Sequence, residues 1–185
     1  MHLEIEAKIS VPSLEPVSQR LKQIGAEFVK SVQETDAYLA DTEGLLFKKG
    51  CGLRLRKQIC GSEKRFYLTY KGPRLGGRFK SRTETEIQIS DYDAALNLFH
   101  ELGFNPSIRV EKNRQIWKWG SCLICLDELP KLGCFVEVEG PDEQQVAKAL
   151  EQIQLSDRPH IPEGYARLMA DAQSQPASEI KNTKT

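Results

Sequence analysis

Three Glu-x-Glu pairs recur along the chain, each in a segment where polar and apolar residues alternate. The pairs are Glu4 and Glu6, Glu84 and Glu86, and Glu137 and Glu139. In a β-strand successive side chains point to opposite faces, so the two carboxylates of each pair share one face. Carboxylates gathered on one surface repel one another and need cations to hold them together. The pattern therefore indicates a bound divalent metal ion.

Basic side chains occupy the same faces of the expected strands. These faces carry the bases Lys8, Arg54, Arg56, Lys71, Arg82, Lys112 and Arg114, together with one further acid, Asp127. The planar fork of arginine suits phosphate, and carboxylates suit Mg²⁺ or Mn²⁺, which in turn bridge phosphate oxygens. One interpretation is a site for a metal-chelated polyphosphate. The other is the solvated face of a one-sided sheet, crossed by salt bridges.

Two features favour an enclosed site over a solvated face. The opposite strand faces are apolar, as at Leu3, Ile5 and Leu53, and helices could cover them. If the sheet closes as a barrel with helices outside, the charged face must point inward. A solvated face also normally mixes Thr, Ser, Gln and Lys, whereas acids and arginines dominate here.

The elements that must position these residues follow one another in a regular order. Strands are expected over 2–10, 34–40, 52–59, 65–71, 82–89, 108–117, 121–128 and 134–139. Helices are expected from Ser13 to Gly25, from Ser90 to Gly103, from Pro141 to Leu155 and over 163–172. Roughly eight strands with short connections predict an α+β fold, a closed antiparallel β-barrel with helices packed outside. The basic, glycine-rich segment 72–81 is predicted to be a mobile lid.

Composition limits the partners and the compartment. The 26 Lys plus Arg residues balance the 26 Asp plus Glu residues, which argues against a general polyanion binder. There is no apolar run that could cross a membrane and no signal-peptide pattern at the start. Five cysteines without a framework spacing indicate a reducing, cytoplasmic compartment, and Cys122 and Cys125 would point to opposite faces of a strand. We expect a single domain over 1–172 and a polar, disordered tail over 173–185.

The ordered motifs resemble those of the CYTH superfamily, also called triphosphate tunnel metalloenzymes. Glu4-x-Glu6-x-Lys8 is similar to the ExExK signature of that family. The later motifs follow in order: Asp36-Ala37-Tyr38, Leu53-Arg54-Leu55-Arg56, Thr69-Tyr70-Lys71-Gly72-Pro73, Arg82-Thr83-Glu84-Thr85-Glu86, Val110-Glu111-Lys112-Asn113-Arg114, Leu126-Asp127 and Leu132-Gly133-Cys134-Phe135-Val136-Glu137-Val138-Glu139. The segment from Gly164 to Leu168 resembles the C-terminal helix of the family.

The resemblance implies an eight-stranded tunnel with a triphosphate inside. Divalent metal, Mg²⁺ or Mn²⁺, would be held by Glu4, Glu6, Glu84, Glu137 and Glu139, with Glu86 and Asp127 completing a second metal site. Phosphate oxygens would be bound by Lys8, Arg54, Arg56, Lys71, Arg82, Lys112 and Arg114. The implied partner is a triphosphate-containing small molecule, with neither nucleic acid nor membrane, and the protein would be a monomer or a homodimer.

Hydrolysis is the activity that we favour for such a tunnel. Water would attack the terminal phosphorus of inorganic triphosphate, thiamine triphosphate or a nucleoside triphosphate. Glu4, Glu6 and Lys8 would be the catalytic residues. Lys8 could act as the base if desolvation and neighbouring cations lowered its pKa, and lowering of the pKa of water by the metal is the alternative.

Two other activities stay open. The tunnel could serve a class IV adenylyl cyclase, in which the ribose 3′-oxygen of ATP attacks the α-phosphorus to give cyclic AMP and pyrophosphate. It could also belong to a polyphosphate- or nucleotide-binding module without catalysis. All the motif carboxylates and cations are present, which argues against a module without catalysis.

Overall fold

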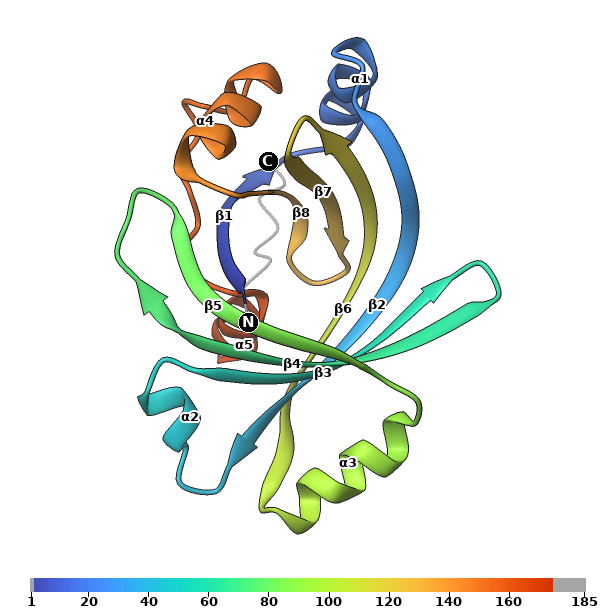
Figure 1. Ribbon diagram of the computed structural model, residues 1–185, viewed down its shortest axis with the longest axis vertical. Helices are drawn as coiled ribbons and strands as arrows, with labels where there is room; N and C mark the ends of the chain where they lie inside the picture. Colours follow the sequence, from blue (N-terminus) through green and yellow to red (C-terminus); the bar gives the residue numbers. More distant parts are fainter. Residues whose placement is uncertain (1, 175–185) are drawn as a thin grey trace, which may run out of the picture.

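The computed structural model describes residues 2–174, which form a closed antiparallel barrel with helices around it (Figure 1). The strands are β1 (His2–Val11), β2 (Glu27–Asp41), β3 (Gly52–Cys60), β4 (Glu63–Leu75), β5 (Lys80–Ile89), β6 (Phe104–Trp119), β7 (Cys122–Leu129) and β8 (Gly133–Gly140). The helices are α1 (Glu15–Gln23), α2 (Leu45–Lys48), α3 (Tyr92–Glu101), α4 (Glu143–Gln152) and α5 (Tyr165–Ser174).

The order of the strands around the barrel is β1-β5-β4-β3-β2-β6-β7-β8, and β8 pairs again with β1. Two runs of consecutive strands, β2 to β5 and β6 to β8, are joined through the long-range pairs β2–β6, β1–β5 and β1–β8. A closed barrel has no unpaired edge strand. The predicted eight-stranded antiparallel barrel of the α+β class is confirmed.

The outer face of the barrel is apolar and lies beneath helices. Ile5 and Ile9 of β1 pack in one cluster with residues of α1 and α4. Leu53 and Leu55 of β3 pack in a second cluster with residues of α3. Because alternate side chains point to opposite faces, the charged neighbours of these residues point into the lumen.

Helix α5 departs from the prediction that the helices pack outside. Its residues Tyr165 and Met169 pack against Val110 and Phe135. Phe135 shares a strand face with Glu137, which lines the lumen, so this cluster lies on the inner side of the wall. The apolar side of α5 therefore packs into the barrel and closes part of the lumen.

The prediction of a mobile lid over 72–81 is wrong for most of that segment. β4 continues to Leu75 and β5 begins at Lys80, so only 76–79 lie outside strands. At the start of α4, Glu143 accepts hydrogen bonds from the backbone N–H groups of Arg78 and Phe79 at 2.7 and 3.4 Å. These bonds tie the connection to α4, and the flanking residues become part of the barrel wall.

Other boundaries also differ from the prediction. β2 and β6 run well past 34–40 and 108–117 because they pair with each other along most of their length. The short helix α2 was not predicted, and Asp41 stabilises its start by accepting hydrogen bonds from the N–H groups of Leu45 and Leu46.

No helix in residues 2–174 has the length and apolar character needed to span a membrane. The first two residues of the tail predicted over 173–185 are the end of α5. The rest of that predicted tail lies outside the described residues.

Candidate functional site

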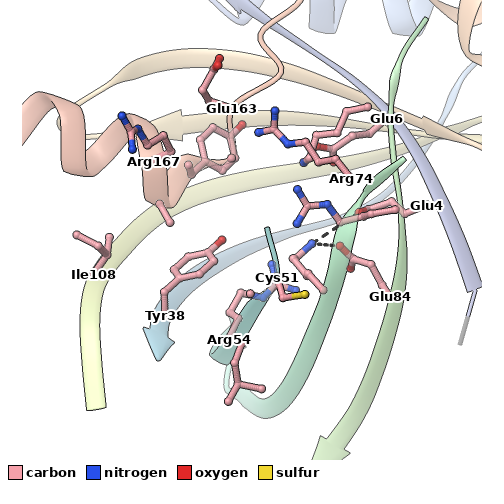
Figure 2. A pocket seen from close by; sticks show the side chains of 18 of the residues that line it. Glu4, Glu6, Tyr38, Cys51, Arg54, Arg74, Glu84, Ile108, Glu163 and Arg167 are labelled. Carbon is pink, nitrogen blue, oxygen red and sulfur yellow. Dashed lines mark hydrogen bonds and ion pairs between the residues drawn. The ribbon is translucent and has the colours of Figure 1, made fainter. Parts of the chain in front are cut away.

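The lumen holds a cavity of about 950 Å³ (Figure 2). Thirteen of the predicted site residues line it, namely Glu4, Glu6, Lys8, Arg54, Arg56, Lys71, Arg82, Glu84, Glu86, Lys112, Arg114, Glu137 and Glu139. They come from strands that are distant in the sequence, and closure of the barrel brings them onto one inner wall. Cys125 also lines the cavity, whereas Cys122 packs in the outer core, so the two thiols do lie on opposite faces.

Lys8 lines the cavity and is held by three neighbours. Its Nζ lies 3.3 Å from Oε1 of Glu137 and donates a hydrogen bond to the backbone carbonyl of Glu163 at 2.9 Å. The same ammonium lies 3.9 Å from the centre of the Tyr165 ring. Burial lowers the pKa of Lys8, and the charges of Glu137 and Glu6 oppose that shift.

A chain of buried ion pairs runs across β2, β3 and β6. Arg56 donates to Asp36 from Nε at 2.6 Å and from Nη2 at 2.7 Å, and to Glu34 from Nη1 at 3.1 Å. Lys112 Nζ lies 3.3 Å from Glu34 and 3.5 Å from Asp127. Burial alone would raise the pKa of Glu34 and of Asp36, but the facing cations outweigh it and hold both below their usual range.

We expect this network to make the stability of the fold fall in acid. The folded-state pKa of Asp36 is lowered, so its carboxylate stabilises the fold at pH values above the unfolded-state pKa of about 3.9. The stabilisation is lost as the pH falls through the lower, folded-state pKa. Asp36→Asn should thus unfold more easily at neutral pH and show a flatter dependence below about pH 4. Urea unfolding across this range measures the effect, and equal pH slopes in both proteins would contradict it.

Asp127 is the one predicted site residue that does not line the cavity. Its side chain is fully buried, and Arg114 binds both of its oxygens. The Tyr165 hydroxyl donates to Oδ2 at 2.8 Å. Asp127 therefore contacts Arg114 and Tyr165 in this structure, and its predicted role as a metal ligand stays a prediction.

Two arginines face each other across β4 and β5. Arg74 and Arg82 are partners in register, and both line the cavity. Neither guanidinium makes a hydrogen bond or ion pair within residues 2–174, although Arg82 is only 9% exposed. Like charges directly opposite each other destabilise a sheet, unless a counter-ion lies between them. The pair is therefore a candidate anion site.

Two carboxylates meet on β1 and β5 in the same cavity. Glu4 lies beside Glu84, and Lys71 forms ion pairs with both. Burial raises the pKa of Glu4, and the charge of Lys71 opposes the shift. Oε2 of Glu4 is buried without a hydrogen-bond partner in the described part of the chain, and it lies 3.7 Å from Lys71 Nζ. An orphaned carboxylate oxygen beside a second carboxylate is suited to a cation.

A second acidic pair lies further along β1. Glu6 is opposite Glu139 in register, and Lys80 forms an ion pair with Glu6. The described residues contain no group of three or more His, Cys, Asp or Glu side chains arranged to hold a metal ion. Lys71 contacts both members of the Glu4 and Glu84 pair, and Lys80 contacts Glu6 of the second pair. The carboxylate oxygens are nevertheless the ligand type that Mg²⁺ and Mn²⁺ prefer, so the donor set fits such an ion.

Several residues of the site are missing from the sequence prediction. Glu34 and Asp36 form an acidic pair on one strand face, the same signal that singles out the Glu-x-Glu pairs. Arg74 and Lys80 fall in the segment predicted as a loop, where no strand face could be assigned. Tyr165 lies on the predicted terminal helix, and no sequence signal places that helix in the lumen.

The fold and this charged lumen define a class of barrel proteins, and the chain belongs to the CYTH family. The CYTH domain profile matches residues 2–165, which confirms the resemblance. A Methanocaldococcus jannaschii protein provisionally named an adenylate cyclase is 29% identical over 153 residues, or 82% of this chain and 85% of that protein.

Solved structures agree with the family assignment. A Pyrococcus horikoshii protein of 27% identity has a TM-score of 0.78 and covers 90% of this chain and 99% of its own. A Hippeastrum protein, provisionally named an adenylyl cyclase and described as having a dominant triphosphatase activity, is 17% identical. Its TM-score is 0.66, over 94% of this chain and 96% of its own, and at that identity the likeness shows the fold alone.

Proposed function

We propose that this protein binds a triphosphate-bearing small molecule inside the barrel and hydrolyses it with the help of Mg²⁺ or Mn²⁺. The observation that carries the proposal is the facing pair Arg74 and Arg82, two guanidinium groups that line the same cavity and have no partners among residues 2–174. Guanidinium groups bind phosphate oxygens in a bidentate manner. Membership of the CYTH family and the triphosphatase activity described for the Hippeastrum protein support the same class of substrate.

The remaining cations would complete the phosphate site. Arg54 donates from Nη2 to Thr69 and Glu86, and its Nε is buried without a partner among residues 2–174, so it retains a donor for a ligand. Lys8 and Lys112 line the same cavity. Arg56 and Arg114 also line it, but their guanidinium groups are directed at buried carboxylates, which gives them a supporting role.

The acidic pairs would hold the divalent ion, which in turn would neutralise phosphate charge and lower the pKa of water. The candidate ligands are Glu4, Glu6, Glu84, Glu86, Glu137 and Glu139. Lys71 and Lys80 now neutralise two of these carboxylates. With a metal ion in that role, both lysines would be available to bind phosphate oxygens.

Lys8 is the candidate for moving a proton. Contacts with Glu137, the Glu163 carbonyl and the Tyr165 ring fix the position of its Nζ. Burial lowers its pKa, which is the condition for an amine to accept a proton from attacking water. The barrel wall and α5 would keep bulk water away from the reacting phosphate.

Cyclisation of ATP is the second candidate, and the name of the Methanocaldococcus jannaschii relative favours it. In that reaction the ribose 3′-oxygen attacks the α-phosphorus, and pyrophosphate leaves. The same cations and carboxylates would serve with the substrate shifted along the cavity. A third candidate is a module without catalysis, which would bind a polyphosphate or a nucleotide in the same cavity.

A product assay separates these functions. The purified protein is incubated with inorganic triphosphate, thiamine triphosphate or ATP, each with Mg²⁺, with Mn²⁺ and with an excess of EDTA. We expect orthophosphate as the fast product, and we expect EDTA to reduce its formation to background. Cyclic AMP with matching pyrophosphate would replace hydrolysis with cyclisation. Turnover that is unaffected by EDTA would contradict the metal-dependent mechanism.

A further inference from the structure

The turn between β4 and β5 is held by a side chain from a distant part of the sequence. Residues 76–79 form this turn, and Figure 1 shows it beside α4. Oε1 of Glu143, in the first turn of α4, accepts hydrogen bonds from the backbone N–H groups of Arg78 and Phe79 at 2.7 and 3.4 Å. Hydrogen bonds to an ionised carboxylate are stronger than those between neutral groups. The turn is therefore fixed to α4 as well as to its own strands.

Gly77 makes room for this carboxylate. Its φ is +147°, a conformation that glycine adopts far more readily than residues with a side chain. A Cβ atom at this position would lie 2.6 Å from Oε1 of Glu143, which is much closer than van der Waals contact. The backbone of the turn and the Glu143 carboxylate are thus closely fitted to each other.

Phe79 anchors the same turn in the apolar core. It is only 3% exposed and packs in one cluster with Val146 of α4. The His160 ring lies against it, with the ring centroids 5.1 Å apart. A hydrogen-bonded contact and an apolar contact therefore fix the turn on the same helix.

The strands on either side of the turn carry three cations of the cavity, and Arg74 depends on the turn most. Lys80 and Arg82 lie on β5, which is also paired with β1. The pairing of β4 with β3 ends at Lys71. Beyond the register shift that follows Lys71, β4 pairs with β5 alone within residues 2–174. Arg74 therefore has one neighbouring strand, and the turn begins two residues later.

We propose that Glu143 is a positioning residue for Arg74. Its carboxylate fixes the turn and so keeps Arg74 opposite Arg82, where the two guanidinium groups can bind one phosphate group together. Glu143 is exposed and is not among the described residues that line the cavity, so it acts through the turn without touching substrate. The inference rests on the proposed function, since it assumes that the arginine pair binds phosphate.

The test measures kcat/KM for inorganic triphosphate at fixed Mg²⁺. Glu143→Ala removes the acceptor and should reduce kcat/KM roughly tenfold, because small displacements of a substrate-binding group are costly. Glu143→Gln keeps a side-chain oxygen and should retain most of the activity. It also removes the same charge from the first turn of α4, so it controls for effects on the helix. Glu151→Ala, at another exposed position of α4, should leave kcat/KM unchanged.

A double-mutant cycle shows whether Glu143 acts through Arg74. In an Arg74→Ala background, Glu143→Ala should have almost no further effect, because both changes then remove the same contact with phosphate. A tenfold loss in both backgrounds would contradict the positioning role. Hydrogen exchange gives a readout without substrate, since the amides of Arg78 and Phe79 should lose protection in Glu143→Ala and keep it in Glu143→Gln.

The outcomes distinguish the inference from the proposed function. If wild-type protein hydrolyses triphosphate and Glu143→Ala does so equally well, the inference fails while the proposed function stands. Equal losses of activity in Glu143→Ala and Glu143→Gln would also reject it, because the hydrogen-bond acceptor would then not be what matters. If wild-type protein neither hydrolyses inorganic triphosphate, thiamine triphosphate or ATP nor binds any of them in calorimetry, the proposed function fails and the inference with it.

Discussion

Replacing Glu6 with Gln should reduce triphosphate turnover at least about 100-fold while leaving the barrel folded. Glu6 is only 6% exposed and is opposite Glu139 in register, so its carboxylate lies within one of the acidic pairs of the lumen. The amide keeps the size of the side chain and removes the negative charge that would hold Mg²⁺ or Mn²⁺. Glu4→Gln should act in the same direction, because the orphaned oxygen of Glu4 belongs to the other acidic pair.

The matched control is Glu111→Gln, on the outer side of β6. Glu111 is exposed and forms a surface ion pair with Arg109 at 2.6 Å, so the same chemical change occurs outside the lumen. Calorimetric titration with Mn²⁺ alone gives a readout that is independent of turnover. We expect weakened Mn²⁺ binding in Glu6→Gln and unchanged binding in Glu111→Gln. Near-normal turnover in either Glu4→Gln or Glu6→Gln would reject the metal assignment.

The sequence predicts the barrel because its two strand faces carry different signals. In β1, Glu4, Glu6 and Lys8 alternate with Ile5 and Ile9, and this local pattern already fixes which side faces the lumen. The local pattern does not determine contacts between segments that are distant in the sequence. The pairing of β2 with β6 extends both strands, and the packing of α5 into the lumen depends on the shape of the closed barrel.

The candidate site is predictable to the same extent. Residues on clear strand faces, such as Arg54 and Lys112, do line the cavity. Arg74 and Lys80 are not predicted, because the glycine-rich stretch around them reads as a loop. The end of β4 and the start of β5 therefore cannot be assigned from the sequence. Asp127 shows the opposite limit, since its strand face is correct but Arg114 and Tyr165 occupy its carboxylate. Alternation reveals which way a side chain points, but it cannot reveal what the side chain meets there.

Arg56 is where the structure changes an expectation most. The sequence predicts a phosphate ligand, yet the guanidinium already donates to Asp36 from two nitrogens and to Glu34 from the third. We therefore expect Arg56→Ala to act mainly on stability. It leaves two buried carboxylates without their closest cation, and removal of one partner from a buried ion pair costs about 3–5 kcal/mol. Urea unfolding at neutral pH measures the loss.

Arg65→Ala on the neighbouring strand is the matched control, because Arg65 pairs with Glu63 in solvent and its loss should leave the unfolding free energy almost unchanged. A double-mutant cycle of Arg56→Met with Asp36→Leu tests the mechanism further. Removing both partners should cost less than the sum of the two single changes, because each single change leaves an uncompensated buried charge. If Arg56→Ala instead keeps wild-type stability and only weakens the apparent affinity for triphosphate, then Arg56 contacts substrate directly, and the ion pairs with Glu34 and Asp36 give way when substrate binds.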